Sequence, residues 1–273
     1  DAAMSDKLAP PTIKNVGDTF LLKWAEGLEM RIDHITEKSE GISGEILVMR
    51  AGLHIYQARV NMLGPTAKKS LANELNERID TVDWRILVEQ AFTKTLDLFR
   101  KGDEVVQVGH LPKRDSPKYR IKPLVLEKEL NALYAFGGTG KSLVSQFLAV
   151  LVQTGANAVG MTVQKGNALI LDWETNREKV DENIQAIKKG LKIDSPDEPF
   201  YRRCYRPLAN DIYAIQSIMA EKDIKFVIVD SANMAAGISE SFHTPALSMV
   251  GALRSLNCSV LIVDHKPKKG ETM

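Results

Sequence analysis

A glycine-rich turn between an apolar run and a helical pattern, within residues 131–148, constrains the fold more than any other feature. The apolar residues 133–136 are typical of a buried strand, and the residues from Lys141 onward repeat apolar side chains at helical spacing. A strand, a glycine-rich loop and a helix that opens with Lys and Ser form the arrangement of a nucleoside triphosphate-binding loop. We therefore expect an α/β domain in which this loop holds phosphate.

The loop contains the residue types that phosphate binding needs. Its glycines let consecutive backbone N–H groups curl around an anion, and the helix points its positive dipole end at the same place. Lys141 can reach the β- and γ-phosphates of ATP, and Ser142 can place its hydroxyl on Mg²⁺. Ala135 stands where the strict motif has its first glycine, and an ordinary glycine turn before a helix is the alternative. The expected nucleotide-binding residues are Gly137, Gly138, Thr139, Gly140, Lys141 and Ser142.

Beyond residue 124, apolar runs alternate with helical patterns. Strands are expected at residues 131–136, 168–173, 200–204, 225–230 and 259–265, and helices at 141–154, 177–190, 210–222 and 244–256. Near-continuous apolar runs are typical of a parallel sheet that is covered on both faces. With right-handed crossovers, the alternation predicts a three-layer α/β domain over residues 124–273.

The first half of the chain has a different pattern. Residues 1–17 are expected to be a loose arm, residues 18–100 a small α+β domain and residues 101–123 a linker rich in Gly, Pro and charge. Alternating strands are expected at residues 20–24, 30–35, 45–49 and 56–62, with a turn at 41–44, and helices at 67–79 and 84–99. These elements predict an antiparallel meander that is covered by two helices, with Asp83 available as an N-cap.

Bulk properties exclude several classes of protein. The formal net charge of +1 provides no global field that would attract nucleic acid, although a local patch stays possible. Cys204 and Cys258 lack metal-ligand spacing and lie in apolar contexts, as expected for reduced core thiols of a cytoplasmic protein. The apolar runs are shorter than the roughly 20 residues of a membrane span, so no membrane partner is expected.

Two further strands end in carboxylates. Asp230 follows the run KFVIV, and a carboxylate at the end of a parallel strand faces the ligand crevice, where it can hold Mg²⁺ opposite Ser142. An N-cap for the following segment is the alternative for Asp230. The run LIL ends in Asp172-Trp173-Glu174, and Glu174 is expected to polarise the water that attacks the γ-phosphate. Asp172 is the less favoured base, and a solvated carboxylate is the structural alternative for Glu174.

Two other segments have a functional and a structural interpretation. His265 ends the strand SVLIVDH, where it can sense the γ-phosphate and signal to Lys266 and Lys268, or can be purely structural; Asp264 is the weaker sensor candidate. Residues 201–206, YRRCYR, interleave bases with aromatics. They either bind nucleic acid by stacking and phosphate contact or form an edge strand with solvated arginines.

The segments AFGGTGKS, LILDWETN, FVIVDSA and VLIVDHKPK together resemble the RecA-like P-loop ATPases with an AAA ATPase-type domain, and among them the RepA-like hexameric replicative helicases. The resemblance covers about residues 120–270. It implies ATP and Mg²⁺ as cofactors, Lys141, Glu174 and His265 as catalytic residues, and Ser142 and Asp230 as metal ligands. It also implies a sheet in which the strands at 200, 168, 225, 259 and 131 follow one another from one edge.

The resemblance leaves several functions open. The family core usually continues with DNA-facing loops and an arginine finger, so we expect this core to be truncated at Met273. The main hypothesis is a Mg²⁺-dependent ATPase that assembles as a ring or filament and acts in DNA replication or recombination, with single-stranded DNA as a possible partner. The alternative is an ATP-dependent switch that binds a partner and turns over little. A small-molecule kinase would need an arginine-rich lid, which we do not find in the sequence.

Overall fold

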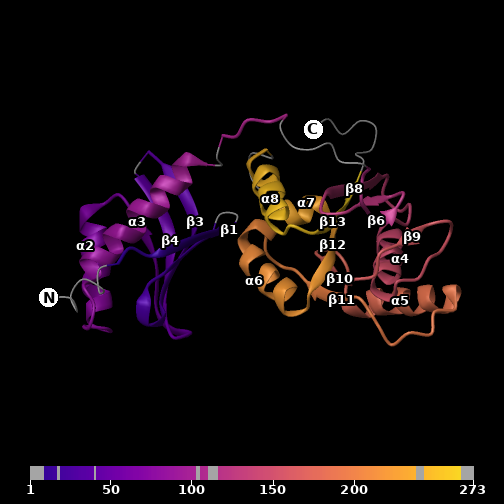
Figure 1. Cartoon of the computed structure of the whole chain (residues 1–273), viewed down its shortest axis with the longest axis horizontal. Helices are drawn as coiled ribbons and strands as arrows, with labels where there is room; N and C mark the ends of the chain where they lie inside the picture. Colours follow the sequence, from indigo (N-terminus) through magenta and orange to yellow (C-terminus); the bar gives the residue numbers. More distant parts are fainter. Residues whose placement is uncertain are drawn as a thin grey trace. The chain divides into compact units, whose positions relative to one another are not determined.

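A computed structural model provides the structure of the chain, and it describes residues 9–16, 19–39, 41–102, 105–109, 116–237 and 243–265. The chain forms two compact units, Asp1–Leu111 and Pro112–Met273. Each unit is built around a sheet of its own (Figure 1).

The first unit contains an antiparallel meander in its described residues. The strands β1 (Thr12–Val16), β2 (Thr19–Lys23), β3 (Leu28–Lys38), β4 (Gly41–Arg50) and β5 (Leu53–Asn61) pair in chain order. A short 3-10 turn, Ala25–Gly27, joins β2 to β3. Buried and partly exposed residues alternate along β4, as expected when one face of a sheet is covered.

The helices α2 (Pro65–Asn76) and α3 (Trp84–Lys101) supply that cover. Met30, Ile32 and Ile46 of the sheet belong to one buried cluster with Leu75 of α2 and Phe92 of α3. Asp83 caps α3, because its carboxylate accepts hydrogen bonds from the backbone N–H groups of the first helical turn. The predicted small α+β arrangement is therefore confirmed.

The second unit is built on a parallel sheet in the described residues. Its strands β8 (Leu130–Ala135), β10 (Asn167–Asp172), β11 (Phe200–Arg203), β12 (Ile224–Asp230) and β13 (Ser259–His265) follow the order β11-β10-β12-β13-β8. All four neighbouring pairs are parallel. This is the strand order that the resemblance implies.

Helices cover both faces of this sheet (Figure 1). The helices α4 (Lys141–Thr154) and α5 (Arg177–Leu191) share a buried cluster with alternate residues of β10 and β12, such as Ile170 and Phe226. The opposite residues of these strands, such as Leu171 and Val229, pack with α6 (Leu208–Glu221), α7 (Ala232–Ala236) and α8 (His243–Ser255). The predicted three-layer α/β fold is therefore confirmed.

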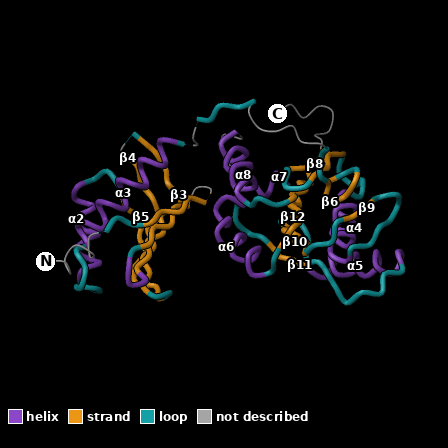
Figure 2. The backbone as a smooth tube through the Cα atoms, viewed as in Figure 1, coloured by secondary structure: helices purple, strands orange, loops and turns teal. Residues whose placement is uncertain are grey.

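Three local predictions are wrong. Residues 12–16, expected in the loose arm, form β1 by pairing with β2, and Gly41, expected in a turn, begins β4. The expected linker contains β6 (Tyr119–Lys122), which pairs with β7 (Val125–Leu126) and β9 (Thr162–Val163). Figure 2 shows this small sheet beside α4. Such short strands have too few residues to show alternation in the sequence.

The cysteines and helices agree with the bulk properties. Cys204 and Cys258 are buried and free, and burial raises the pKa of their thiols to about 11 and about 12. Both thiols therefore keep their protons at neutral pH. None of the helices in the described ranges has the length and apolar character that crossing a membrane requires.

Candidate active site

The sheet brings four sequence-predicted segments to one edge. In the β10–β12 register Asp172 pairs with Asp230, and in the β13–β8 register His265 pairs with Ala135, just before the glycine-rich loop. The carboxyl ends of parallel strands meet at the same edge, which is where ligands bind in open α/β sheets. The loop, both acidic segments and His265 therefore lie around one location.

The glycine-rich loop has open space at its glycines. Gly138 and Gly140 have φ angles of 73° and 83°, which favour glycine. A Cβ added at Gly137, Gly138 or Gly140 would meet no protein atom within 4 Å. Since α4 begins at Lys141, its first backbone N–H groups end at this open loop. The open space at the glycines, the unpaired backbone N–H groups at the start of α4 and the positive end of the helix dipole together suit the binding of an anion.

Lys141 places its charge at the loop. The residue is only 5% exposed, and its Nζ donates to the carbonyl oxygens of Ala135 at 2.9 Å and Phe136 at 2.7 Å. These bonds hold the ammonium beside the turn, and a third proton stays available for an anion. Thr139 also stabilises the turn, because its hydroxyl donates to the Phe136 carbonyl at 2.8 Å.

Asp230 and Ser142 form a pair that fits a divalent cation. Asp230 is 5% exposed, and its Oδ1 is buried with no hydrogen-bond partner in the described residues. Burial raises the pKa of the Asp230 carboxyl, nearby Glu174 and Asp172 add to the rise, and a hydrogen bond with Ser142 opposes it. A buried carboxylate oxygen without a partner, beside a hydroxyl, is a suitable hard-oxygen donor set for Mg²⁺.

Asp172, the alternative base, is held in a structural role. It is 2% exposed, and its Oδ1 accepts from the backbone N–H groups of Glu174 at 2.8 Å and Thr175 at 2.9 Å. Its Oδ2 accepts from the Tyr201 hydroxyl at 3.1 Å, and Arg203 Nη1 lies 3.6 Å from Oδ1. A carboxylate with both oxygens bonded in this way is poorly placed to take a proton from water.

Glu174 is exposed where Asp172 is buried. Its side chain is 40% exposed, one carboxylate oxygen accepts a hydrogen bond from the Ser231 hydroxyl, and His265 Nε2 lies 3.8 Å from the same oxygen. Ser231 itself is buried and directly follows Asp230. One oxygen of the carboxylate thus contacts residues at the ends of β12 and β13, while the side chain as a whole stays partly exposed.

His265 lies near Glu174, with its Nε2 3.8 Å from a carboxylate oxygen, and pairs with Ala135 of the strand that precedes the loop. Asp264, the weaker sensor candidate, accepts a hydrogen bond from the His265 backbone N–H at 2.8 Å. Lys266 and Lys268, the expected route for the signal, lie outside the described residues.

The basic and aromatic segment 201–206 makes mostly internal contacts. Arg202 pairs with Asp211, and Arg203 donates to the Thr175 carbonyl. Tyr201 bonds to Asp172, whereas Tyr205 is 85% exposed with Arg203 over its ring. These contacts favour the edge-strand interpretation over a nucleic-acid surface.

Sequence reasoning did not assign Ser231, Tyr201 and Arg203 to this site, although it had singled out residues 201–206 for another role. The contact between Ser231 and Glu174 joins residues 57 positions apart, and Tyr201 and Arg203 come from a neighbouring strand. The sequence motifs indicated only that polar residues lie near the ends of these strands, and not which of them are in contact.

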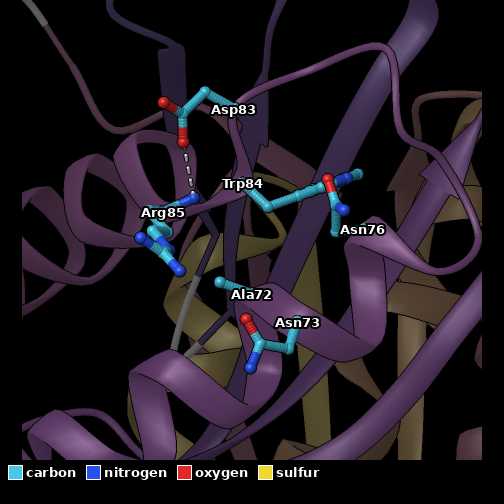
Figure 3. A pocket seen from close by; sticks show the side chains of 6 residues that line it. All are labelled: Ala72, Asn73, Asn76, Asp83, Trp84 and Arg85. Carbon is cyan, nitrogen blue, oxygen red and sulfur yellow. Dashed lines mark hydrogen bonds between the residues drawn. The ribbon is translucent and has the colours of Figure 1, made fainter.

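Two polar groupings in the first unit have ordinary structural roles. A hollow of about 290 Å³ lies between α2 and the start of α3. The Asp83 carboxylate there accepts a hydrogen bond from the Arg85 backbone N–H at 3.1 Å, as the helix cap (Figure 3). In the second group, Asp33 and Glu45 lie near His34, at 2.9 and 3.7 Å from Nδ1. Guanidinium groups accompany both carboxylates, since Arg31 lies 3.0 Å from Asp33 and Arg59 4.0 Å from Glu45. That charge balance disfavours an added cation.

One protein family model matches the part of the chain that contains these strand ends. A family model described as an AAA domain, AAA_25, matches residues 97–271, which include all the segments around the loop. No curated protein matches the chain.

Proposed function

Because this chain belongs to the AAA_25 family and is a P-loop ATPase, we propose that it hydrolyses Mg²⁺-ATP with Glu174 as general base. The observation that carries the proposal is the contrast between two nearby carboxylates. Asp172 is buried and has both oxygens bonded, whereas Glu174 is exposed beside His265. Of the two carboxylates, Glu174 is the one that solvent can approach.

The phosphates lie along the loop in this proposal. The backbone N–H groups of residues 137–142 bind them, and Lys141 turns from the carbonyls of Ala135 and Phe136 toward the β- and γ-phosphates. Ser142 and Asp230 would hold the cation, since Asp230 Oδ1 is buried and has no hydrogen-bond partner among the described residues. When bound, Mg²⁺ neutralises charge that develops on the phosphate oxygens.

Hydrolysis then needs one proton transfer at Glu174. The carboxylate accepts a proton from water while the water oxygen bonds to the γ-phosphorus, and the bond to the β–γ bridging oxygen breaks to release ADP. Ser231 and His265 hold the carboxylate from one side, and His265 can donate to the γ-phosphate oxygens. Loss of phosphate would leave His265 without that partner, which is the basis of the proposed sensor role.

Assembly and a DNA role belong to the same proposal and rest on the resemblance to RecA-like and RepA-like ATPases. A head-to-tail ring or filament would let a neighbouring copy supply a cation to each phosphate site. Single-stranded DNA is then the proposed partner in replication or recombination. The alternative is a switch that binds ATP and a partner with little turnover.

One experiment separates these functions. Phosphate release is measured for the purified chain with Mg²⁺-ATP, across protein concentrations, with and without single-stranded DNA. If the protein is a motor, turnover per chain should rise with protein concentration and with added single-stranded DNA. Tight nucleotide binding with negligible turnover under every condition would favour the switch, and absence of nucleotide binding would refute both.

A further inference from the structure

The segment that carries Glu174 is tied down on both sides. After β10, the backbone N–H of Trp173 donates to the Asp230 carbonyl of β12 at 2.8 Å. On the other side, the Trp173 indole donates to the Arg206 carbonyl at 2.9 Å. The position of the Glu174 backbone therefore depends on the chain that leaves the edge strand β11 as well as on its own strand.

Asp172 connects this segment to side chains of β11. One of its oxygens accepts the backbone N–H groups of Glu174 and Thr175, and the other accepts the Tyr201 hydroxyl. Burial and the Asp172 charge raise the pKa of Tyr201 to about 12, so the hydroxyl keeps its proton and donates at any ordinary pH.

Arg203 adds a second connection from the same strand. Its guanidinium donates to the carbonyl of Thr175 and lies 3.6 Å from the Asp172 carboxylate. The two peptide groups that flank Thr175 are thus held through its carbonyl and its N–H, one by Arg203 and the other by Asp172.

We propose that Tyr201 and Arg203 are positioning residues, which fix the Glu174 carboxylate for hydrolysis by holding Asp172 and the Thr175 carbonyl. The inference rests on the proposed role of Glu174. A general base must lie within hydrogen-bond reach of the attacking water, and displacement by about 1 Å can cost up to about a hundredfold in rate. The hydrogen bonds from β11 limit that displacement.

Tyr201→Phe tests the proposal, because it removes the hydroxyl and keeps the partly buried ring. Tyr205→Phe is the matched control, since Tyr205 lies in the same segment and is 85% exposed. We expect Tyr201→Phe to lower kcat about three- to tenfold with an unchanged KM for ATP. Tyr205→Phe should change neither. Arg203→Lys, which keeps the charge but loses the planar fork, should also lower kcat alone.

Two readouts distinguish positioning from general stability. Hydrogen exchange of the Glu174 and Thr175 amides should become about fivefold faster in Tyr201→Phe, as expected for loss of about one ordinary hydrogen bond from their acceptor. In a Glu174→Gln background, Tyr201→Phe should change the residual turnover by less than about twofold, because residues that act as a unit are not additive.

The outcomes separate this inference from the proposed function. Unchanged amide exchange in Tyr201→Phe overturns the inference whatever the turnover is. Faster exchange with unchanged kcat also overturns it, because the segment is then held for another purpose. Wild-type turnover in Glu174→Gln alone would instead refute the choice of base.

Discussion

Two carboxylate-to-amide substitutions, two residues apart, should differ greatly in their effect on stability. Asp172→Asn changes a side chain that is 2% exposed and accepts three hydrogen bonds. Asn keeps one carbonyl oxygen for the two backbone N–H groups, but its NH₂ group then faces the Tyr201 hydroxyl. Hydrogen bonds to charged groups contribute about 1 kcal/mol more than neutral ones, so three of them imply a loss of about 3 kcal/mol.

Glu174→Gln should have only a small effect on the free energy of unfolding. Its side chain is 40% exposed, and the amide oxygen of Gln can still accept the Ser231 hydrogen bond. We expect Glu174→Gln to change the free energy of unfolding by less than about 0.5 kcal/mol.

Calorimetry of both variants tests the contrast. For a unit of this size, about 1 kcal/mol shifts Tm by roughly 2–4 °C, so Asp172→Asn should lower Tm of the second unit by about 6–12 °C. Glu174→Gln should stay within about 2 °C of the wild type. Equal shifts for the two variants would refute the assignment of Asp172 to structure and Glu174 to solvent-accessible chemistry.

Three substitutions and one change of condition probe the phosphate site, the metal site and assembly. Lys141→Ala should weaken nucleotide binding and abolish turnover. Lys141→Arg should also bind nucleotide weakly, because the guanidinium group of Arg does not fit the loop. Equilibrium nucleotide titration checks both variants, and wild-type affinity would refute the assignment of the loop to phosphate binding. Burial raises the pKa of the Asp230 carboxyl in the folded protein above its ordinary value of 3.8. Ionisation of Asp230 therefore lowers the free energy of unfolding when the pH is above the raised pKa, and has no effect on it when the pH is below 3.8. Without Mg²⁺, Asp230→Asn should therefore raise Tm at pH 7, and this gain should disappear toward pH 4. A Tm gain that does not depend on pH would contradict this. The same substitution should raise the Mg²⁺ concentration that turnover needs. Turnover per chain should increase with protein concentration if a neighbour completes each site, and fast, concentration-independent hydrolysis by a monomer in light scattering would oppose assembly.

Long periodic elements were predictable from the sequence because burial fixes their pattern. The strand Ser259–His265 and the helix Lys141–Thr154 have the predicted bounds, since each is an uninterrupted apolar or apolar-periodic run. The strand Thr12–Val16 was missed because TIKNV follows two prolines and has little apolar character; pairing with β2 creates it.

The site was predictable in part for a related reason. The motif places Lys141 after the loop that follows one strand, and Asp230 and Glu174 at or just beyond the ends of two others; a parallel sheet brings these strand ends together. The contacts that distinguish Glu174 from Asp172 come from Tyr201 and Ser231. Such contacts depend on three-dimensional register between β10, β11 and β12, which periodicity along one segment does not contain.

A single-turnover measurement of Glu174→Gln tests the central claim most directly. Saturating protein is mixed with Mg²⁺-ATP, and nucleotide affinity and the rate of phosphate release are measured on the same preparation. We expect Glu174→Gln to bind nucleotide with an affinity near that of the wild type and to hydrolyse ATP at least about a hundredfold more slowly. Gln retains the size and hydrogen bonding of Glu but not its basicity. A wild-type hydrolysis rate, above all if Asp172→Asn abolishes hydrolysis while remaining folded, would contradict it.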